Sequence, residues 1–179
     1  MTIEIVDSYT EATSTGDGIM SSSVSWMQGL GQSFTAIETF TTLDSARWYL
    51  KNVGAPSGSM YAKVYTHSGV FGTSSIPSGA ALAVSDAYEA STVPTSYTWI
   101  TFSFTGANRI TLTPGAKYVL TVEYSGANYI YCSYDYTTPT HSGNSCYLQG
   151  SWGEDSGDLP FTVYGDGNVR VGRRFPLWL

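Results

Sequence analysis

Hydrophobic and polar residues alternate along most of the chain, most clearly on both sides of a turn rich in Gly, Pro and Ser. The turn lies within residues 47–65, RWYLKNVGAPSGSMYAKVY. Six alternate residues share one apolar face: Ala46, Trp48, Leu50, Met60, Ala62 and Val64. A period of two around a turn predicts an antiparallel hairpin with one buried face. Pairing Leu50 with Met60 sets two basic residues opposite each other, so a register shifted by two stays open.

Shorter alternating segments predict further strands, and no segment has a convincing helical period. They lie at residues 1–7, 31–36, 39–43, 82–86, 97–104, 110–112, 118–124, 128–136, 145–149 and 159–164. Residues 128–136 and 145–149 are interpreted as a second hairpin, and residues 67–80 as a surface loop. The predicted core positions include Phe34, Ile100, Phe102, Phe104, Tyr118, Leu120, Val122 and Tyr124. Many short strands separated by turns predict an all-β fold, which we interpret as a two-sheet antiparallel β-sandwich of jelly-roll type.

Composition divides the chain into three parts. Residues 1–30 are largely polar and predict an N-terminal arm or a segment that covers a sheet edge, and residues 31–167 form the β-sandwich domain. Residues 168–179 interleave apolar residues with arginines and predict a C-terminal docking tail, with a last strand folded back on the body as the alternative. The candidate docking residues of the tail are Arg170, Arg173, Arg174, Phe175 and Trp178.

Size and charge narrow the class of protein. A chain of 179 residues suits one domain that can bury a core without a metal or disulfide. The net charge is −6, and residues 1–169 hold five basic and fourteen acidic residues. An acidic body argues against nucleic-acid binding, and the lack of an apolar run of 18 residues argues against a membrane span. The opening residues lack a signal-peptide pattern, so we expect the protein to stay in the cell that makes it or to leave by lysis, assembly or another route, with a removed signal as the alternative.

The sequence predicts no catalytic residues. The two histidines, His67 and His141, lie in predicted loops rich in Gly and Ser, and no Gly-x-Ser-x-Gly motif is present. Glu123 lies within a strong strand pattern but on the face opposite the core. No pair of acids is placed across a cleft, as glycoside hydrolysis requires. We therefore expect a protein that is not an enzyme.

Metal ligands are sparse. Four acids near one predicted loop, Asp135, Glu154, Asp155 and Asp158, are weak candidates for Ca²⁺, which takes oxygen ligands. Their spacing does not match an EF-hand loop, so we predict no metal and no cofactor, with Ca²⁺ as the alternative. Cys132 and Cys146 would lie directly opposite each other in a hairpin centred on Pro139. They are candidates for a cross-strand disulfide, or for two facing thiols in a reducing compartment.

Aromatic residues crowd the later part of the chain. Five of them are candidates for a carbohydrate or partner surface: Tyr129, Tyr131, Tyr134, Tyr136 and Trp152. Residues 129–136 place tyrosines on both faces of a strand, so some must point outward. Exposed aromatic rings suit stacking against sugars or burial at a protein interface. The alternative is that tyrosine is used here only as a good strand residue.

Four segments together resemble a known kind of domain: GQSFTA, LKNVGAPSGSMYAKVY, LTPGAKYVLTVEYSG and DLPFTVYGDG. They are similar to jelly-roll β-sandwich modules of phage virion proteins and bacterial surface proteins, whose architecture is like that of carbohydrate-binding modules. The resemblance covers about Gly31–Gly167. It consists of turn and core residues, so it implies a fold and supplies no catalytic residues.

The resemblance implies a non-catalytic virion structural protein, a capsid decoration or tail component of a phage, that docks through its terminal arms. Its expected partners are other virion proteins and further copies of itself, with a homotrimer as our guess, and it would be assembled in the host cytoplasm. No nucleic acid and no membrane are expected as partners. The alternative is an extracellular carbohydrate-binding module that uses its exposed Tyr and Trp residues on a cell-surface glycan.

Overall fold

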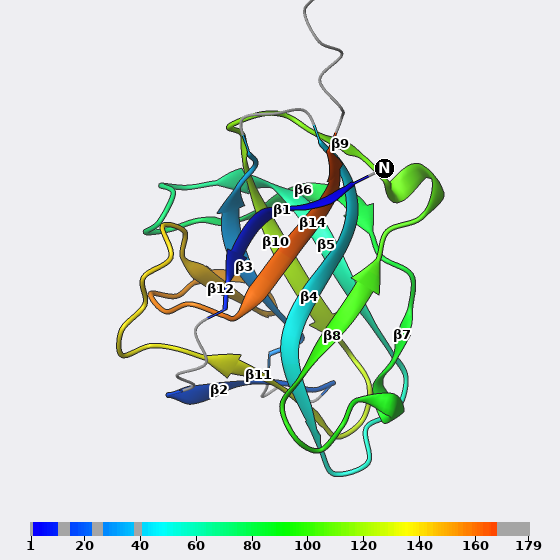
Figure 1. The fold of residues 1–179 in the computed structure, drawn as a ribbon. Coiled ribbons are helices and arrows are strands. Elements are labelled where there is room, and N and C mark those ends of the chain that lie inside the picture. Colours follow the sequence, from blue (N-terminus) through cyan, green and yellow to red (C-terminus); the bar gives the residue numbers. More distant parts are fainter. Residues whose placement is uncertain (1, 11–14, 23–26, 38–40, 168–179) are drawn as a thin grey trace, which may run out of the picture.

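Two antiparallel β-sheets pack face to face in the computed structural model, which describes residues 2–10, 15–22, 27–37 and 41–167 (Figure 1). Sheet A contains β1 (Ile3–Tyr9), β2 (Gly16–Met20), β4 (Thr41–Val53), β8 (Thr98–Ser103), β9 (Thr111–Leu112), β11 (Tyr129–Tyr134) and β14 (Phe161–Gly167). Sheet B contains β3 (Gly29–Thr35), β5 (Ser59–Ser68), β6 (Ile76–Val84), β7 (Tyr88–Glu89), β10 (Lys117–Tyr124), β12 (Ser145–Gln149) and β13 (Ser151–Glu154). The predicted all-β, two-sheet antiparallel sandwich is confirmed, and the arrangement is compatible with a jelly roll.

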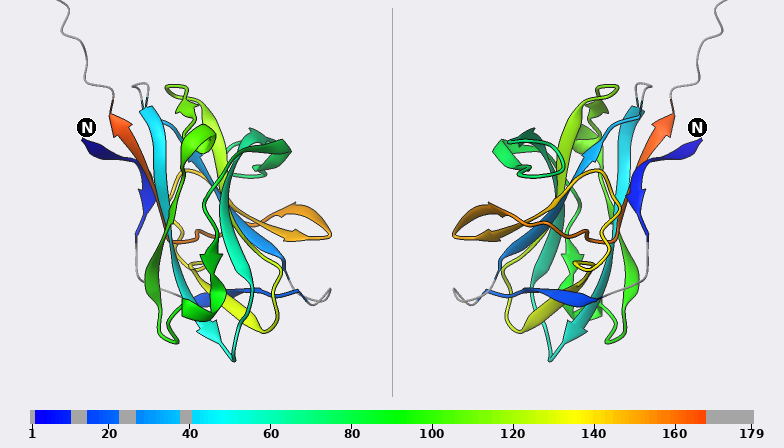
Figure 2. Two further views of the ribbon diagram at one scale, coloured as in Figure 1. Left: turned by 90° about the vertical axis from the view of Figure 1, so that its right-hand side faces the viewer. Right: turned by 90° about the vertical axis from the view of Figure 1, so that its left-hand side faces the viewer.

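Helix contributes little to the described residues. Two short 3₁₀ turns, η1 (Ala90–Thr92) and η2 (Gly106–Asn108), interrupt the connections between strands. Neither they nor any other described helix is long and apolar enough to span a membrane. The two layers are seen from the side in Figure 2.

Sheet A is organised around β4. Residues 45–50 of β4 pair with β8, and the overlapping residues 41–48 pair with β14, so β8 and β14 lie on opposite edges of β4. β11 pairs with residues 50–53, beyond the end of β14. β1 adds to β14 and β2 adds to β11. One side of sheet A is therefore divided into two ribbons, β1–β14 and β2–β11.

Sheet B runs in the order β13-β12-β3-β10-β5-β6, and β7 also pairs with β5. Its central strand β10 is rich in β-branched and aromatic residues, which favour a pleated surface. Tyr118, Leu120, Val122 and Tyr124 of β10 are buried, as predicted. Phe34 stacks on Tyr118, with ring centroids 5.7 Å apart.

The predicted hairpin at residues 46–64 is wrong, although its apolar face is correct. All six alternate residues are buried, but β4 belongs to sheet A and β5 to sheet B. Residues 54–58 therefore carry the chain from one sheet to the other, and the six side chains meet across the core. Gly54 and Gly58 both have φ of +88°, a backbone conformation that favours glycine. Alternation reveals which face is buried, but it does not reveal which strand is the neighbour.

The second predicted hairpin is wrong for the same reason. β11 pairs with β2 and β4 in sheet A, whereas β12 pairs with β3 and β13 in sheet B. Cys132 and Cys146 are free, buried thiols on different sheets, so the predicted cross-strand disulfide is not formed. The predicted loop at residues 67–80 is shorter than expected, since β5 continues to Ser68 and β6 begins at Ile76.

Both ends of the sequence were predicted to dock on partners. Within residues 1–30, the described parts include β1 and β2, which form the outer strands of the two ribbons of sheet A. The tail, residues 168–179, lies outside the described residues, and with it the candidate docking residues Arg170, Arg173, Arg174, Phe175 and Trp178.

Candidate functional site

A backbone bridge closes the gap between the two ribbons of sheet A. Asp135 follows β11 and Asp158 precedes β14, and each backbone N–H donates to the other residue's carbonyl, at 2.9 and 2.8 Å. Both acids are buried. Two of the four weak Ca²⁺ candidates, Asp135 and Asp158, are therefore part of the junction between the ribbons.

Protein donors surround the Asp135 carboxylate. The hydroxyl of Tyr9 donates at 2.8 Å and that of Thr15 at 3.3 Å. The backbone N–H groups of Thr137 and Thr138 donate at 3.0 and 3.1 Å. Burial by itself raises the pKa of Asp135, but these donors outweigh it and hold the pKa below its usual value. The oxygens that would bind Ca²⁺ already accept hydrogen bonds from the protein.

The Asp158 carboxylate accepts hydrogen bonds from Gln32 Nε2 and from the backbone N–H of His141, both at 2.8 Å. Burial raises the pKa of Asp158, and these donors offset only part of that effect. The other two Ca²⁺ candidates, Glu154 and Asp155, are exposed. The described residues contain no group of three or more His, Cys, Asp or Glu side chains suited to a metal ion.

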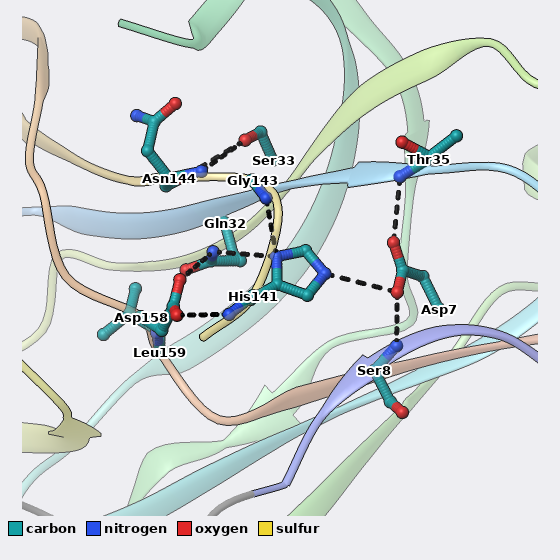
Figure 3. Close-up of polar contacts among 10 residues, drawn as sticks. All are labelled: Asp7, Ser8, Gln32, Ser33, Thr35, His141, Gly143, Asn144, Asp158 and Leu159. Carbon is teal, nitrogen blue, oxygen red and sulfur yellow. Dashed lines mark hydrogen bonds and ion pairs between the residues drawn. The ribbon is translucent and has the colours of Figure 1, made fainter. Parts of the chain in front are cut away.

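His141 links this junction to β1 (Figure 3). Its Nδ1 accepts the backbone N–H of Gly143 at 3.0 Å and lies 3.3 Å from Gln32 Nε2. Its Nε2 lies 3.2 Å from Asp7 Oδ1, so the ring donates to Asp7 from Nε2. Asp7 also accepts the backbone N–H of Thr35 at 2.9 Å. The cluster thus connects β1, β3 and the segment that follows β11.

The same geometry limits what His141 can do chemically. An Asp–His pair activates a nucleophile only when the second ring nitrogen faces a hydroxyl or thiol. Here that nitrogen accepts from Gly143 and contacts Gln32, so no nucleophile–base hydrogen bond is formed. A polar cavity of about 450 Å³ lies beside the ring. Its lining consists of Asp7, Ser8, Tyr9, Thr10, Thr140, His141 and Ser142.

A second cluster lies on the outer face of sheet A. In β4 the side chains that alternate with the core residues Trp48 and Leu50 belong to Arg47, Tyr49 and Lys51. Cross-strand pairing places Trp99 of β8 beside Tyr49 and Tyr131 of β11 beside Lys51. We call the cluster the aromatic face, and its members are Arg47, Tyr49, Lys51, Tyr97, Trp99, Tyr131 and Tyr164. All are half-buried.

Rings and cations contact one another in succession across the aromatic face. The Tyr49 ring lies 5.2 Å from the rings of both Tyr97 and Trp99, nearly parallel to Tyr97 at 22°. The Arg47 guanidinium lies 5.0 Å from the ring of Trp99 and 5.0 Å from that of Tyr164. Lys51 extends the series, with its Nζ 4.4 Å from the ring of Tyr97 and 5.2 Å from that of Tyr131. The result is a continuous layer of rings and cations, held on strands except for Tyr97, which directly precedes β8.

The two cations of the aromatic face differ in their partners. Lys51 Nζ lies 3.3 Å from a carboxylate oxygen of Asp17, which also accepts a hydrogen bond from the Tyr97 hydroxyl. Burial and this bond to Asp17 raise the pKa of Tyr97. Arg47 forms no ion pair with a described residue, and its nearest polar contact is Thr162 Oγ1 at 3.5 Å. Its Nε is buried and has no hydrogen-bond partner among the described residues.

The predicted aromatic surface is divided among three places. Tyr131 belongs to the aromatic face, and Tyr129 adjoins it with ring centroids 6.4 Å apart. Tyr134 accepts the N–H of Gly157 and contacts the exposed Tyr136, and burial raises the pKa of Tyr134 to about 12. Trp152 lies in sheet B, against Tyr65.

Most of the aromatic face was missed in the sequence. The alternation of residues 46–50 already placed Arg47 and Tyr49 opposite the core, and the alternation of residues 97–104 did the same for Trp99. The signal was therefore present, but the incorrect hairpin assigned these residues other neighbours. Nothing local in the sequence indicates that Asp7 meets His141, 134 residues away.

No protein-family model, no curated protein and no solved structure matches the chain. The resemblance to phage and bacterial surface modules therefore stays a prediction in everything beyond the two-sheet architecture. The function has to be inferred from the geometry of the described residues.

Proposed function

We propose that the protein is a non-catalytic binding module that holds saccharide rings against the aromatic face of sheet A. The observation that carries the proposal is the continuous layer of five half-buried rings, Tyr49, Tyr97, Trp99, Tyr131 and Tyr164, on the outward side of the sheet. Aromatic rings offer a large apolar contact area together with a polar group at the edge. Strands fix the rings before a ligand arrives, which reduces the entropy lost on binding.

Strand propensity alone would place single tyrosines on the outer side of a sheet, whereas the aromatic face groups several rings together. Single exposed apolar side chains are normal on a protein surface, whereas contiguous patches mark sites of interaction. The rings also alternate with cations and lie next to the partly exposed Asp17, which supplies a hydrogen-bonding group. A surface that combines ring faces with a few polar groups suits a ligand that is itself apolar on its ring faces and polar at its edges.

The buried polar cluster supports a non-catalytic role. Asp7 and His141 are the pair closest to an acid–base arrangement, but both ring nitrogens of His141 are engaged within the protein. The cluster connects strands on both sheets, so we assign it to stability. We therefore assign the outer face a role in binding without catalysis.

The test is a glycan array followed by polysaccharide pull-down. We expect the parent protein to bind at least one glycan, and Tyr49→Ala and Trp99→Ala to weaken that binding at least tenfold. Trp152→Ala is the matched control, because Trp152 lies in sheet B and should leave glycan binding unchanged. Circular dichroism would confirm that each variant is folded. A parent protein that binds no glycan would contradict the proposal.

A virion structural role is the second candidate, as a capsid decoration or tail protein of a phage. Its support is the composition of residues 168–179, together with Ile3 and Ile5 on edge strand β1, which are 49% and 56% exposed. Exposed apolar residues on an edge strand suit contact with another protein chain or another copy. Deleting residues 168–179 should then abolish incorporation into particles while the sandwich still folds. Unchanged incorporation would reject the tail as the anchor.

A further inference from the structure

We propose that the aromatic face takes an acidic saccharide and that Arg47 receives its carboxylate. This inference rests on the proposed glycan-binding function and names the class of ligand. Arg47 differs from most of the other basic residues in residues 1–169 in its ion-pair partners.

Arg47 has no carboxylate partner among the described residues, unlike three other cations of the body. Lys51 pairs with Asp17, Lys63 with Glu123, and Arg109 with both Asp44 and Asp166. Lys117 also has no ion pair in the described residues, but it is exposed and lies over the ring of Phe71. Arg47 is thus the half-buried cation without an acid in the described part of the chain.

The described surroundings of Arg47 use little of its hydrogen-bonding capacity. The rings of Trp99 and Tyr164, each 5.0 Å from the guanidinium, favour its positive charge. They cannot accept in-plane hydrogen bonds, and the weak contact to Thr162 uses only one of the five N–H groups. A guanidinium that is partly removed from water and lacks an acceptor is an unfavourable arrangement. A carboxylate would satisfy it with two parallel hydrogen bonds.

The position of Arg47 connects this carboxylate to a stacked sugar. The guanidinium lies between Trp99 and Tyr164, so a sugar seated against the outer edges of these two rings would carry a substituent towards Arg47. A uronic or sialic acid provides a carboxylate attached directly to the sugar ring. The geometry therefore points to one carboxylate per bound sugar.

Charge and composition favour an acidic saccharide over an acidic peptide or a polyanion. Residues 1–169 have nine more acidic than basic residues, so the body as a whole repels polyanions. Arg47, the half-buried cation without an ion pair among the described residues, requires a local contact instead. The aliphatic neighbours of the aromatic face lie at its two edges, where Ile5 pairs with Tyr164 and Ile19 with Tyr131. Its centre alternates cations with rings, whereas the centres of protein interfaces are depleted of charge. An acidic peptide is therefore an outcome of the test that would overturn the inference.

The experiment compares paired glycans with and without a carboxylate. The array carries trigalacturonic acid beside its methyl ester, and sialyllactose beside lactose, and calorimetry measures the affinities of the pairs that bind. We expect the acid of at least one pair to bind ten times more tightly than its neutral counterpart. Arg47→Gln should abolish that preference, so that the acid and the neutral glycan of the pair bind with equal affinity. Arg47→Lys should restore it only in part, because lysine lacks the planar fork.

Lys117→Gln is the control, because it removes a positive charge of the body away from the aromatic face and should keep the preference. Equal affinity for acid and neutral glycans, or binding of neutral glycans alone, would overturn the role of Arg47 and leave the proposed function intact. A protein that binds no glycan would overturn both. Displacement of the bound acid by a glutamate-rich peptide, with the same dependence on Arg47, would assign the face to a protein partner instead.

Discussion

Replacing Asp135 by asparagine tests whether the buried junction of sheet A depends on a charged carboxylate. Asparagine has nearly the same shape, so the backbone bridge to Asp158 can stay in place. One acceptor oxygen remains for the N–H groups of Thr137 and Thr138, which contact Oδ1 of the aspartate. The amide nitrogen takes the place of Oδ2, which accepts the hydroxyl of Tyr9 at 2.8 Å.

The expected loss of unfolding free energy follows from the charge of the acceptor. A neutral hydrogen bond stabilises a protein by about 1 kcal/mol and one to a charged group by about 1.5–3 kcal/mol. Several donors share one carboxylate here, so their contributions do not add, and solvent screening near the surface reduces them further. We therefore expect Asp135→Asn to lower the free energy of unfolding by about 2 kcal/mol at pH 7.

The pH dependence of the free energy of unfolding is the sharper test. The native pKa of Asp135 lies below its unfolded value, so its contribution is present above about pH 4 and is lost as the pH falls through the native pKa. Asp158 has the opposite sign, because burial raises its native pKa above the unfolded value. Its neutral form contributes stability below about pH 4, which is lost as the pH rises through the native pKa. Urea unfolding of the wild type and both asparagine variants at pH 7, 5 and 3 measures both effects.

We expect the loss caused by Asp135→Asn to shrink between pH 5 and 3, and the loss caused by Asp158→Asn to grow between pH 7 and 3. The wild type at each pH is the reference, and equal m-values would show that the compactness of the states is unchanged. If both variants changed with pH in the same direction, our account of the two carboxylates would be wrong.

Two further predictions concern the core. Phe34→Ala should lower the free energy of unfolding by about 3–5 kcal/mol, because Phe34 is fully buried and its removal leaves a cavity between the sheets; urea unfolding measures this, and a loss below 1 kcal/mol would contradict the packing. Cys132 and Cys146 should react with a thiol reagent only after unfolding, because burial raises the pKa of both thiols and excludes the reagent. Labelling of the folded protein at the rate seen in urea would contradict their burial.

Local pattern was sufficient to identify which residues face the core. Trp48, Met60, Phe102 and Leu120 were all placed inward from alternation alone, and all are buried. The reason is that side chains of a strand point to opposite faces with a period of two, whichever strands lie beside it. The all-β class followed from the same property.

Strand pairing could not be predicted from the alternation of apolar and polar residues. The chain crosses from sheet A to sheet B at residues 54–58, and again between β11 and β12, where a tight hairpin was expected. A turn that joins two strands of one sheet and a turn that joins two sheets use the same Gly, Pro and Ser residues. The first incorrect hairpin gave Tyr49 neighbours other than Trp99, and the second led us to place Tyr131 and Trp152 in one candidate surface.

The sequence by itself determined the fold class and the two faces of each strand, because both depend on residues that are near one another in the chain. Only the tertiary structure decided which strands, and therefore which of their faces, lie next to each other. It brought Asp7 to His141 across 134 residues and set Arg47 between Trp99 and Tyr164, with no ion pair to any acid that the structure describes. Contacts of this kind depend on sheet order, which is fixed by the packing of the whole core and leaves no local trace in the sequence.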